Sequence, residues 1–292
     1  MQQTDSLWLE HRLRSACTLE VLARKPGNVH PQAAFDDLDC GDFLRSAAVA
    51  APVLARSAHQ GVGQTVLDAV RATRNVVSSN TNLGMLLLLA PLAAVPRDTP
   101  LADGIEPVLA ALTREDAESA YEAIRLAAAG GLGDVAQGDV AGRPTGTLRE
   151  MMALAEDRDT IASEYSRGFP LVLNFALPAL RRRWRLENWE QAIIGLHLEL
   201  MAQVPDTLIA RKCGLDIARE SAERAARVLS KGWPREPDAI REFGEFDTWL
   251  RAAGHTRNPG TTADLVAAAL FALFRESAGA FDSALAVPGF VI

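Results

Sequence analysis

The sequence predicts an all-α fold, a single compact domain built from many helices. Ala and Leu, the strongest helix formers, are abundant, whereas aromatic residues, which favour strands, make up only 6%. Apolar residues recur at three- and four-residue spacing along most of the chain, and strand-like alternation is scarce. No low-complexity segment or linker divides the 292 residues, so we expect one domain over 1–292.

The first half of the chain predicts five helices. The first covers residues 6–24 and ends at Pro26-Gly27, a pair that breaks helices. Residues 83–95 are apolar all round, so we expect that helix to be central and buried. Helical periodicity predicts the others at 41–59, 63–78 and 114–129.

The second half begins with the longest irregular stretch, a glycine-rich loop near residues 130–146. Thr147 and Glu150 then have the spacing of a capping box, which predicts a helix over 148–166. Periodicity predicts further helices at 169–184, 188–203, 206–213, 215–230, 236–252 and 261–276. After Ala280 we expect an extended tail.

The charge balance limits the ligands. The net charge is -7 and the pI about 5.3, which argues against a broad surface for duplex nucleic acid. A phosphate-bearing ligand must therefore be small and met by a local basic cluster. The densest cluster, Arg181 to Arg185, is typical of a solvated helix end.

Cysteine usage and hydropathy indicate a cytoplasmic protein. Cys17, Cys40 and Cys213 are far apart and form no zinc-type pair, which suits a reducing compartment. The N-terminus is charged and does not resemble a secretory signal. The longest apolar stretch, Met85 to Ala94, is about half of what a membrane span needs.

Two carboxylates fall where periodicity demands apolar side chains. Glu20 lies among the apolar positions of the first helix, and Asp159 lies in the apolar stripe of the helix predicted over 148–166. A core-facing carboxylate costs several kcal/mol unless it is paired, protonated or bound to a cation. An ion pair of Glu20 with Arg24, or of Asp159 with Arg158, is the structural alternative. Two such positions in one chain favour function.

Polar residues also gather beside helix ends. Lys25, Gly27, Asn28 and His30 combine a cation, open backbone, an amide and an imidazole, a set that can clasp phosphate. Asn80, Thr81 and Asn82 precede a helix N-terminus, where the dipole favours an anion.

Two later segments also place polar or charged residues near the start of a predicted helix. Asp206 starts a helix that carries Arg211 and Lys212 one to one and a half turns later. Asp264 follows a Pro-Gly turn, and with Thr261 it fits a capping box, the structural alternative to a ligand contact.

In this order, the segments resemble the triphosphoribosyl-dephospho-CoA synthase family over residues 15–275. The matching residues are Leu19 to Pro31, Asn80 to Gly84, Arg158-Asp159, Asp206-Thr207, Arg211-Lys212, Pro259-Gly260 and Ala263-Asp264. The resemblance implies an all-α transferase that joins ATP to 3'-dephospho-CoA and releases adenine. Its product, 2'-(5''-triphosphoribosyl)-3'-dephospho-CoA, becomes the prosthetic group of lyase-type acyl carrier proteins.

One position departs from the family pattern. In the citrate lyase branch we expect a histidine where this chain has Asn82, so the chain resembles a branch outside the typical citrate lyase members. Two alternatives stay open. One is (tri)phosphoribosyl transfer to another acceptor, such as a methanopterin-type C1-cofactor precursor; the other is a non-catalytic helical ligand-binding or partner protein.

The resemblance gives each residue a hypothetical role in substitution at a ribose anomeric carbon. We expect Lys25, Arg211 and Lys212 at the phosphates, with Gly27, Asn28 and Asn82 donating hydrogen bonds. Glu20 and Asp159 are the candidate ligands of Mg²⁺, which we expect with ATP. Asp206 or His30 is the candidate general base. The remaining positions expected to contact substrate are Arg24, Asn80, Thr81, Arg158 and Asp264.

Overall fold

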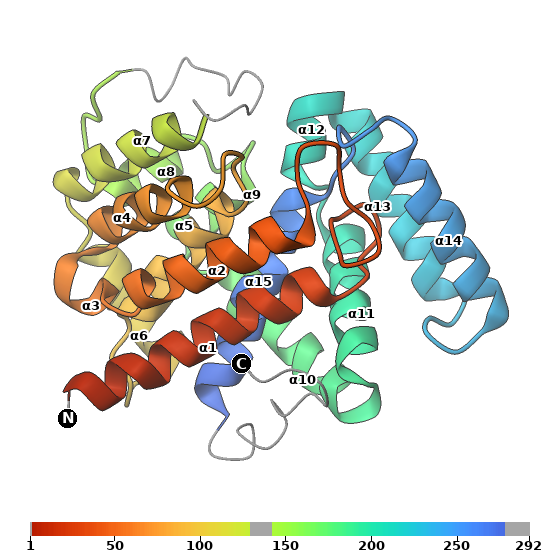
Figure 1. The fold of residues 1–292 in the computed structure, drawn as a ribbon, viewed down its shortest axis with the longest axis horizontal. Coiled ribbons are helices and arrows are strands. Elements are labelled where there is room, and N and C mark those ends of the chain that lie inside the picture. The colour runs from red at the N-terminus through yellow and green to blue at the C-terminus, as the bar shows by residue number, and fades with distance from the viewer. Residues whose placement is uncertain (1, 129–141, 278–292) are drawn as a thin grey trace.

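A computed structural model describes residues 2–128 and 142–277. They form fifteen α-helices and one π-helix, with two isolated β-bridges and no named strand in the described part, which confirms the predicted all-α class (Figure 1). The predicted glycine-rich loop lies largely in residues 129–141, and the predicted tail lies in 278–292; both stretches are outside the described residues.

The N-terminal half contains seven helices. They are α1 (Gln2–Leu22), α2 (Cys40–Leu54), α3 (Ser57–Gln60), α4 (Val62–Arg74), α5 (Leu83–Ala94), α6 (Leu101–Ala110) and α7 (Arg114–Ala128). The expected helix 41–59 is therefore two helices. Helix α6 was not predicted, because Gly104 and Pro107 interrupt its helical pattern.

The remaining elements follow in order. They are α8 (Leu148–Ala153), α9 (Thr160–Arg167), η1 (Leu171–Ala176), α10 (Leu177–Leu186), α11 (Trp189–Gln203), α12 (Thr207–Cys213), α13 (Leu215–Ser230), α14 (Pro237–Arg251) and α15 (Gly260–Glu276). The predicted helix 169–184 begins as the π-helix η1, and Phe169 before it has φ 61°.

The single helix predicted over 148–166 is wrong. The capping box of Thr147 and Glu150 starts α8 as expected, but α8 ends at Ala153 and Leu154 is 69% exposed. Asp159 caps a second helix, α9: its carboxylate accepts from the N–H groups of Ile161 and Ala162. Asp159 is therefore not on an apolar helical stripe, because a side chain that caps a helix must lie at its end.

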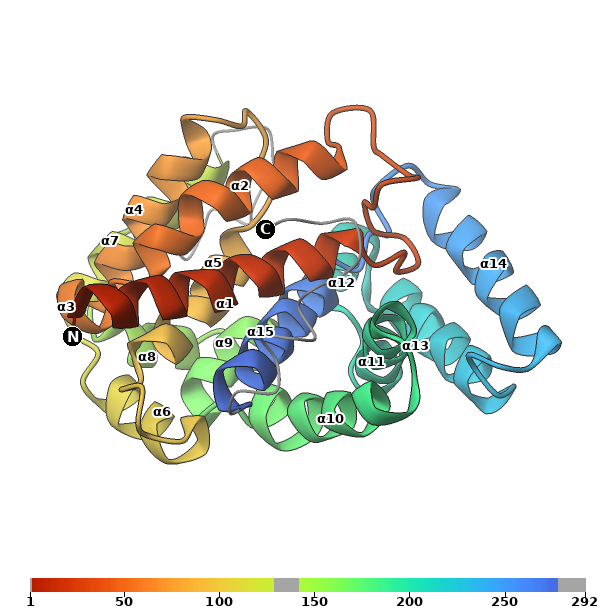
Figure 2. The same ribbon diagram turned by 60° about the horizontal axis from the view of Figure 1, so that its bottom comes forward.

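Two buried helices organise the main core. Every residue of α5 from Met85 to Ala93 is buried, as its all-round apolarity predicts. Helix α15 is also apolar on nearly every side and packs against α1, α5, η1, α10, α11 and α12. Figure 1 shows α15 running through the middle of the molecule behind α1, and Figure 2 shows it below α1.

A second, smaller hydrophobic cluster joins α11 to α12, α13 and α14 through residues such as Leu198, Ile209 and Phe246. The segment between α1 and α2 crosses to this cluster and lies against α14 (Figure 1). In the described residues no single helix has the length and hydropathy to cross a membrane. Helices α11 and α12, which are bent by 58° relative to each other, together reach that length and hydropathy, by length and composition only.

Candidate functional site

The N-termini of α5, α9, α12 and α15 meet at one place, which we call the four-helix junction. Thr207 Oγ1 lies 3.2 Å from Thr261 Oγ1 and 3.5 Å from the main-chain nitrogen of Thr160, linking α12 to α15 and α9. Helix N-termini expose unsatisfied N–H groups and carry a partial positive charge, so four of them together favour an anionic ligand.

Asp264 connects α15 to α5 at this junction. Its Oδ2 lies only 2.0 Å from where a Cβ on Gly84 would stand, so the carboxyl group packs directly on the glycine. The Met85 N–H donates to it. The sequence offered a capping box of Thr261 and Asp264, but α15 has no side-chain cap and begins after Pro259. Asp264 faces α5 instead.

The charge of Asp264 is unfavourable in this place. Burial raises the pKa of its carboxyl well above the usual range, and the carboxylates of Glu20, Asp206 and Asp159 raise it further. Within the part of the chain that the structure describes, no Lys or Arg forms an ion pair with Asp264, Asp159 or Asp206. The junction therefore combines helix N-termini with acidic groups that cap them and that form no ion pair with a described Lys or Arg.

Glu20 reaches the junction from the end of α1. The sequence alternative, a pair with Arg24, is wrong: Glu20 pairs with Lys25 at 2.9 Å, and both side chains are almost fully buried. Arg24 points the other way and binds Glu190 of α11 through two hydrogen bonds of 2.6 and 2.7 Å. One turn before Glu20, burial raises the pKa of the Cys17 thiol to about 12, with Glu20 and Asp264 adding to it.

Lys25 is a helix cap in this structure. Besides Glu20 Oε1, its ammonium donates to the main-chain oxygens of Glu20 and Ala23, which are among the last carbonyls of α1. Three acceptors match the three protons of the ammonium group. All three protons of Lys25 have acceptors within the protein, and its expected contact with a phosphate stays a prediction.

Asp206 holds α12 to α15. Its Oδ1 accepts from the N–H groups of Leu208 and Ile209, and its Oδ2 accepts from the N–H and hydroxyl of Thr262 at 2.8 Å each. Burial raises the pKa of this carboxyl while the hydrogen bonds lower it. Because its lone pairs are already used, Asp206 positions two helix ends, and the general-base hypothesis loses support.

Polar side chains also shape the start of α5. Asn80 Oδ1 accepts from the N–H groups of Asn82 and Leu83, so Asn80 is the side chain that caps this end. Thr81 and Asn82 point inward, to Ser46 Oγ at 2.6 Å and Thr73 Oγ1 at 3.2 Å. These residues set the direction of the N-terminus.

The loop after α1 lies against α14 beside the junction. Gly27, with φ 73°, donates its N–H to Asp247 Oδ1 at 2.7 Å, and Arg251 donates to the main-chain oxygen of Asn28 at 2.7 Å. Asn28 Nδ2 donates to Asn258 Oδ1 at 2.7 Å. The expected hydrogen-bond donors Gly27 and Asn28 are thus already engaged with the protein.

His30 continues this loop. Its Nδ1 accepts from the N–H of Gln32 at 3.2 Å. Burial and the nearby Arg251 lower its pKa to about 4. A neutral ring whose Nδ1 is occupied carries its proton on Nε2, so His30 is a hydrogen-bond donor there and a poor general base.

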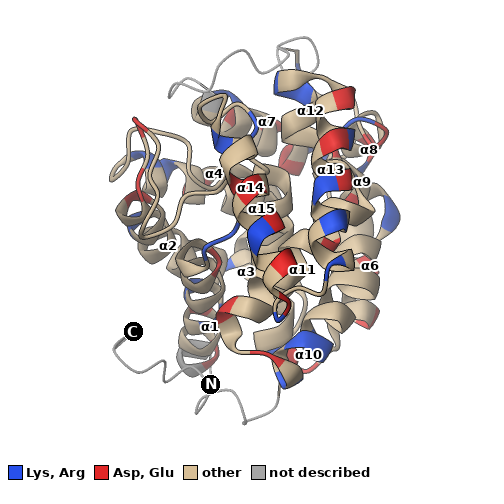
Figure 3. Ribbon diagram, turned by 90° about the vertical axis from the view of Figure 1, so that its right-hand side faces the viewer, with Lys and Arg blue, Asp and Glu red and all other residues tan. Residues whose placement is uncertain are grey.

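Three basic residues expected to contact the substrate lie outside the junction. Arg211 and Lys212 are exposed in the last turn of α12, at the opposite end from its cap Asp206. Arg158 is exposed and donates to the main-chain oxygen of Leu154 at 3.2 Å. Acidic and basic positions are interspersed over α12, α13 and α14 on this side of the molecule (Figure 3).

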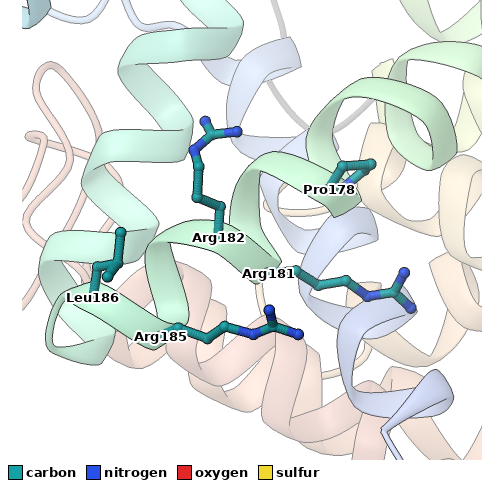
Figure 4. A pocket seen from close by; sticks show the side chains of 5 residues that line it. All are labelled: Pro178, Arg181, Arg182, Arg185 and Leu186. Carbon is teal, nitrogen blue, oxygen red and sulfur yellow. The ribbon is translucent and has the colours of Figure 1, made fainter.

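A basic pocket lies at the far end of α15. Pro178, Arg181, Arg182, Arg185 and Leu186 of α10 line it (Figure 4). Arg181 pairs with Glu276, the last residue of α15, which is about 18 Å along the helix from Asp264 at the usual rise per residue. Arg182 shares Glu199 with the buried Arg183. Acidic side chains thus offset most of the cluster, and it does not extend the junction.

The sequence missed the threonines that join the helix ends and the carboxylate–glycine contact. Thr207, Thr261 and Thr262 look like ordinary helix-start residues, and nothing in the pattern pairs Gly84 with Asp264. Among the described residues, no three His, Cys, Asp or Glu side chains form a ready metal site.

Comparison with known proteins shows the family of this chain. The family model of the ATP:dephospho-CoA triphosphoribosyl transferases matches residues 6–281. A Pseudomonas syringae pv. tomato protein described as a 2-(5''-triphosphoribosyl)-3'-dephosphocoenzyme-A synthase is 34% identical over 105 residues, 36% of this chain and 35% of that protein. A Malonomonas rubra protein of the same description is 29% identical over 119 residues, 40% of this chain and 37% of that protein.

A solved structure extends the likeness beyond those segments, which span little more than a third of the curated relatives' length. The crystal structure of an Archaeoglobus fulgidus protein, described as a triphosphoribosyl-dephospho-CoA synthase, superposes with a TM-score of 0.62 at 27% identity. The superposition covers 80% of this chain and 99% of the Archaeoglobus fulgidus chain. Since the family model matches nearly the whole sequence, the chain belongs to the ATP:dephospho-CoA triphosphoribosyl transferase family.

Proposed function

We propose that this protein transfers the triphosphoribosyl group of ATP to the 2'-hydroxyl of 3'-dephospho-CoA and releases adenine. The observation that carries the proposal is the four-helix junction, where four N-termini meet around Asp159, Asp206 and Asp264. None of these three carboxylates forms an ion pair with a Lys or Arg in the described part of the chain. The names of the family and its relatives support dephospho-CoA as the acceptor over a methanopterin-type precursor or a non-catalytic role.

The reaction breaks one bond and forms one bond at the same carbon. The ribose C1''–N9 bond breaks, the electron pair leaves with adenine, and adenine takes up a proton. A C1''–O bond forms to the acceptor hydroxyl, whose proton goes to a base. Positive charge develops on the ribose ring between these events, so carboxylates beside the ring lower the barrier.

The positive ends of the four helix dipoles suit the triphosphate. The carboxylates of Asp159, Asp206 and Asp264 already accept from N–H groups at these ends, and they repel the triphosphate. A divalent cation bound with the nucleotide resolves this conflict, because Mg²⁺ uses one or two carboxylates together with phosphate oxygens. Asp159 fits as a ligand: both of its capping hydrogen bonds go to Oδ1, leaving Oδ2 for a metal. Glu20 suits the metal less, because Lys25 already neutralises it.

Two carboxyl groups remain for the proton transfers. Asp264, whose pKa is raised by burial and by Glu20, is the candidate acid for adenine. Glu20, whose charge acts on Asp264 and whose Oε1 is bound by Lys25, is the candidate base for the acceptor hydroxyl. This assignment replaces Asp206 and His30, whose acceptor atoms are occupied.

Adenine release tests the proposal. We expect release from ATP only when dephospho-CoA is present, loss of release in EDTA, and product mass equal to the sum of the substrates minus adenine. Asp264→Asn should lower kcat at least about 100-fold, whereas the control Asp216→Asn, on a side chain that is 98% exposed, should be unchanged. Release with another acceptor alone, or with none, contradicts the proposal.

A further inference from the structure

Asn28 has a buried acceptor atom that no described residue satisfies. The residue is 5% exposed, and its Oδ1 is fully buried without a hydrogen-bond donor from residues 2–128 or 142–277. Its other groups are all fixed: Nδ2 donates to Asn258 Oδ1, and the main-chain oxygen accepts from Arg251. The side chain is therefore held in place while the lone pairs of its Oδ1 are unused.

This atom lies beside the four-helix junction. Asn258 precedes Gly260, the first residue of α15, by two positions, and Gly27 is packed against Pro259 at the same turn. From there, Asp264 is about one helical turn away. A ligand bound at the N-terminus of α15 therefore comes within reach of Asn28.

The chemistry of Oδ1 selects the kind of group it meets. A buried acceptor without a donor is costly, so native proteins rarely keep one unless a ligand or water fills the position. A phosphate at neutral pH presents acceptor oxygens and repels a second acceptor. A sugar hydroxyl or the amino group of adenine presents a proton.

We propose that Asn28 Oδ1 accepts a hydrogen bond from a neutral donor, a ribose hydroxyl or the adenine amine, of the bound nucleotide. Asn28 then binds the nucleoside part of the substrate. The sequence led us to expect a phosphate ligand at this position instead. The inference rests on the proposed function of the junction and names a contact within that same site.

Substrate analogues that each lack one donor test this contact. The set is 2'-deoxy-ATP, 3'-deoxy-ATP and purine riboside triphosphate, with CoA replacing dephospho-CoA to remove the 3'-hydroxyl of the acceptor. Wild-type protein should discriminate against one of them by about 10- to 100-fold in kcat/KM. In Asn28→Ala that discrimination should vanish, while the ratio of kcat/KM between the natural substrate and each other analogue should equal the wild-type ratio.

Two further variants separate this effect from a folding defect. Asn28→Asp keeps an acceptor at the same place and should keep the discrimination, even if its melting temperature falls. Asn75→Ala, at an exposed position after α4, is the matched control and should behave as wild type. If Asn28→Ala lowers kcat/KM equally for every substrate, or Asn28→Asp loses the discrimination, the inference is wrong.

Binding measured without turnover distinguishes this failure from failure of the proposed function. Calorimetry measures the dissociation constants of ATP and of each analogue, and their ratio gives the discrimination between the two without turnover. Suppose that the wild type binds ATP more tightly than one analogue, that Asn28→Ala removes this difference, and that no adenine is released with any acceptor. The Asn28 contact is then supported and the proposed reaction is wrong. If ATP does not bind at all, both proposals are wrong.

Discussion

Lys25 Nζ lies 2.9 Å from Glu20 Oε1, and the two side chains are 0% and 4% exposed. Glu20 lies in the last turn of α1 and Lys25 in the loop that follows, where the same ammonium also donates to two main-chain oxygens. A charge buried without its partner is strongly unfavourable, so each residue depends on the other. The pair fixes a carboxylate at the four-helix junction.

Removing the lysine alone should therefore cost stability as well as activity. We expect Lys25→Met to lower the free energy of unfolding by about 3–5 kcal/mol, because it leaves Glu20 buried and unpaired. The matched control Lys231→Met breaks an exposed pair with Glu242 and should cost no more than about 1 kcal/mol. Denaturant titration measures both.

The double variant Glu20→Gln with Lys25→Met separates the two roles. It removes both charges, so we expect most of the lost stability to return. Activity should not return, because the proposed base is gone. Recovery of adenine release in this stable double variant would show that Glu20 has no chemical role.

The contact between Asp264 and Gly84 predicts a steric effect. In Gly84→Ala the new methyl group meets Asp264 Oδ2 at 2.0 Å and must displace the carboxyl. We expect kcat/KM to fall about 100-fold or more with helical content retained.

Gly244→Ala gives the control for this substitution. Gly244 lies in α14 with open space around it, so the alanine should stabilise the protein by about 0.5–1 kcal/mol and leave adenine release unchanged. Unchanged kinetics in Gly84→Ala would mean that the position of Asp264 does not matter to the reaction.

Asp206 should behave as a structural residue. Asp206→Asn places an amide against backbone N–H groups and should lower the melting temperature, since hydrogen bonds linking α12 to α15 are lost. The residual activity should keep the acidic limb of its pH profile at the wild-type position. Disappearance of that limb would restore Asp206 as the general base.

Glu164 gives the protein a pH-dependent stability near neutrality. It is buried, accepts from the N–H groups of Leu171 and Val172 at the start of η1, and burial raises its pKa to about 7. A carboxyl whose pKa is raised on folding contributes stability that is complete below its unfolded value near 4.5 and is lost as pH rises through about 7.

The test compares wild type with Glu164→Gln, which cannot ionise. Between pH 4.5 and 8 the stability of wild type should fall relative to the variant by up to about 3 kcal/mol, from the shift in pKa. Parallel stability curves for the two proteins over this range would exclude a raised pKa at Glu164.

The sequence by itself determined the helical class and most helix positions. Apolar periodicity predicted the helices α5 and α15, all-round apolarity predicted that α5 is buried, and Pro26-Gly27 ended α1. These signals act within a few residues. The same local logic failed at Asp159, where an apolar spacing continued across a break that only the capping geometry reveals.

Only the tertiary structure decided how the polar residues are used. Lys25 and Arg24 are adjacent in sequence, yet one is buried against Glu20 and the other binds Glu190 at the surface. Asp264 meets Gly84 across 180 positions, a pairing that no local pattern encodes. Side-chain partners depend on how whole helices pack, and packing is set by the sum of apolar contacts over the entire chain.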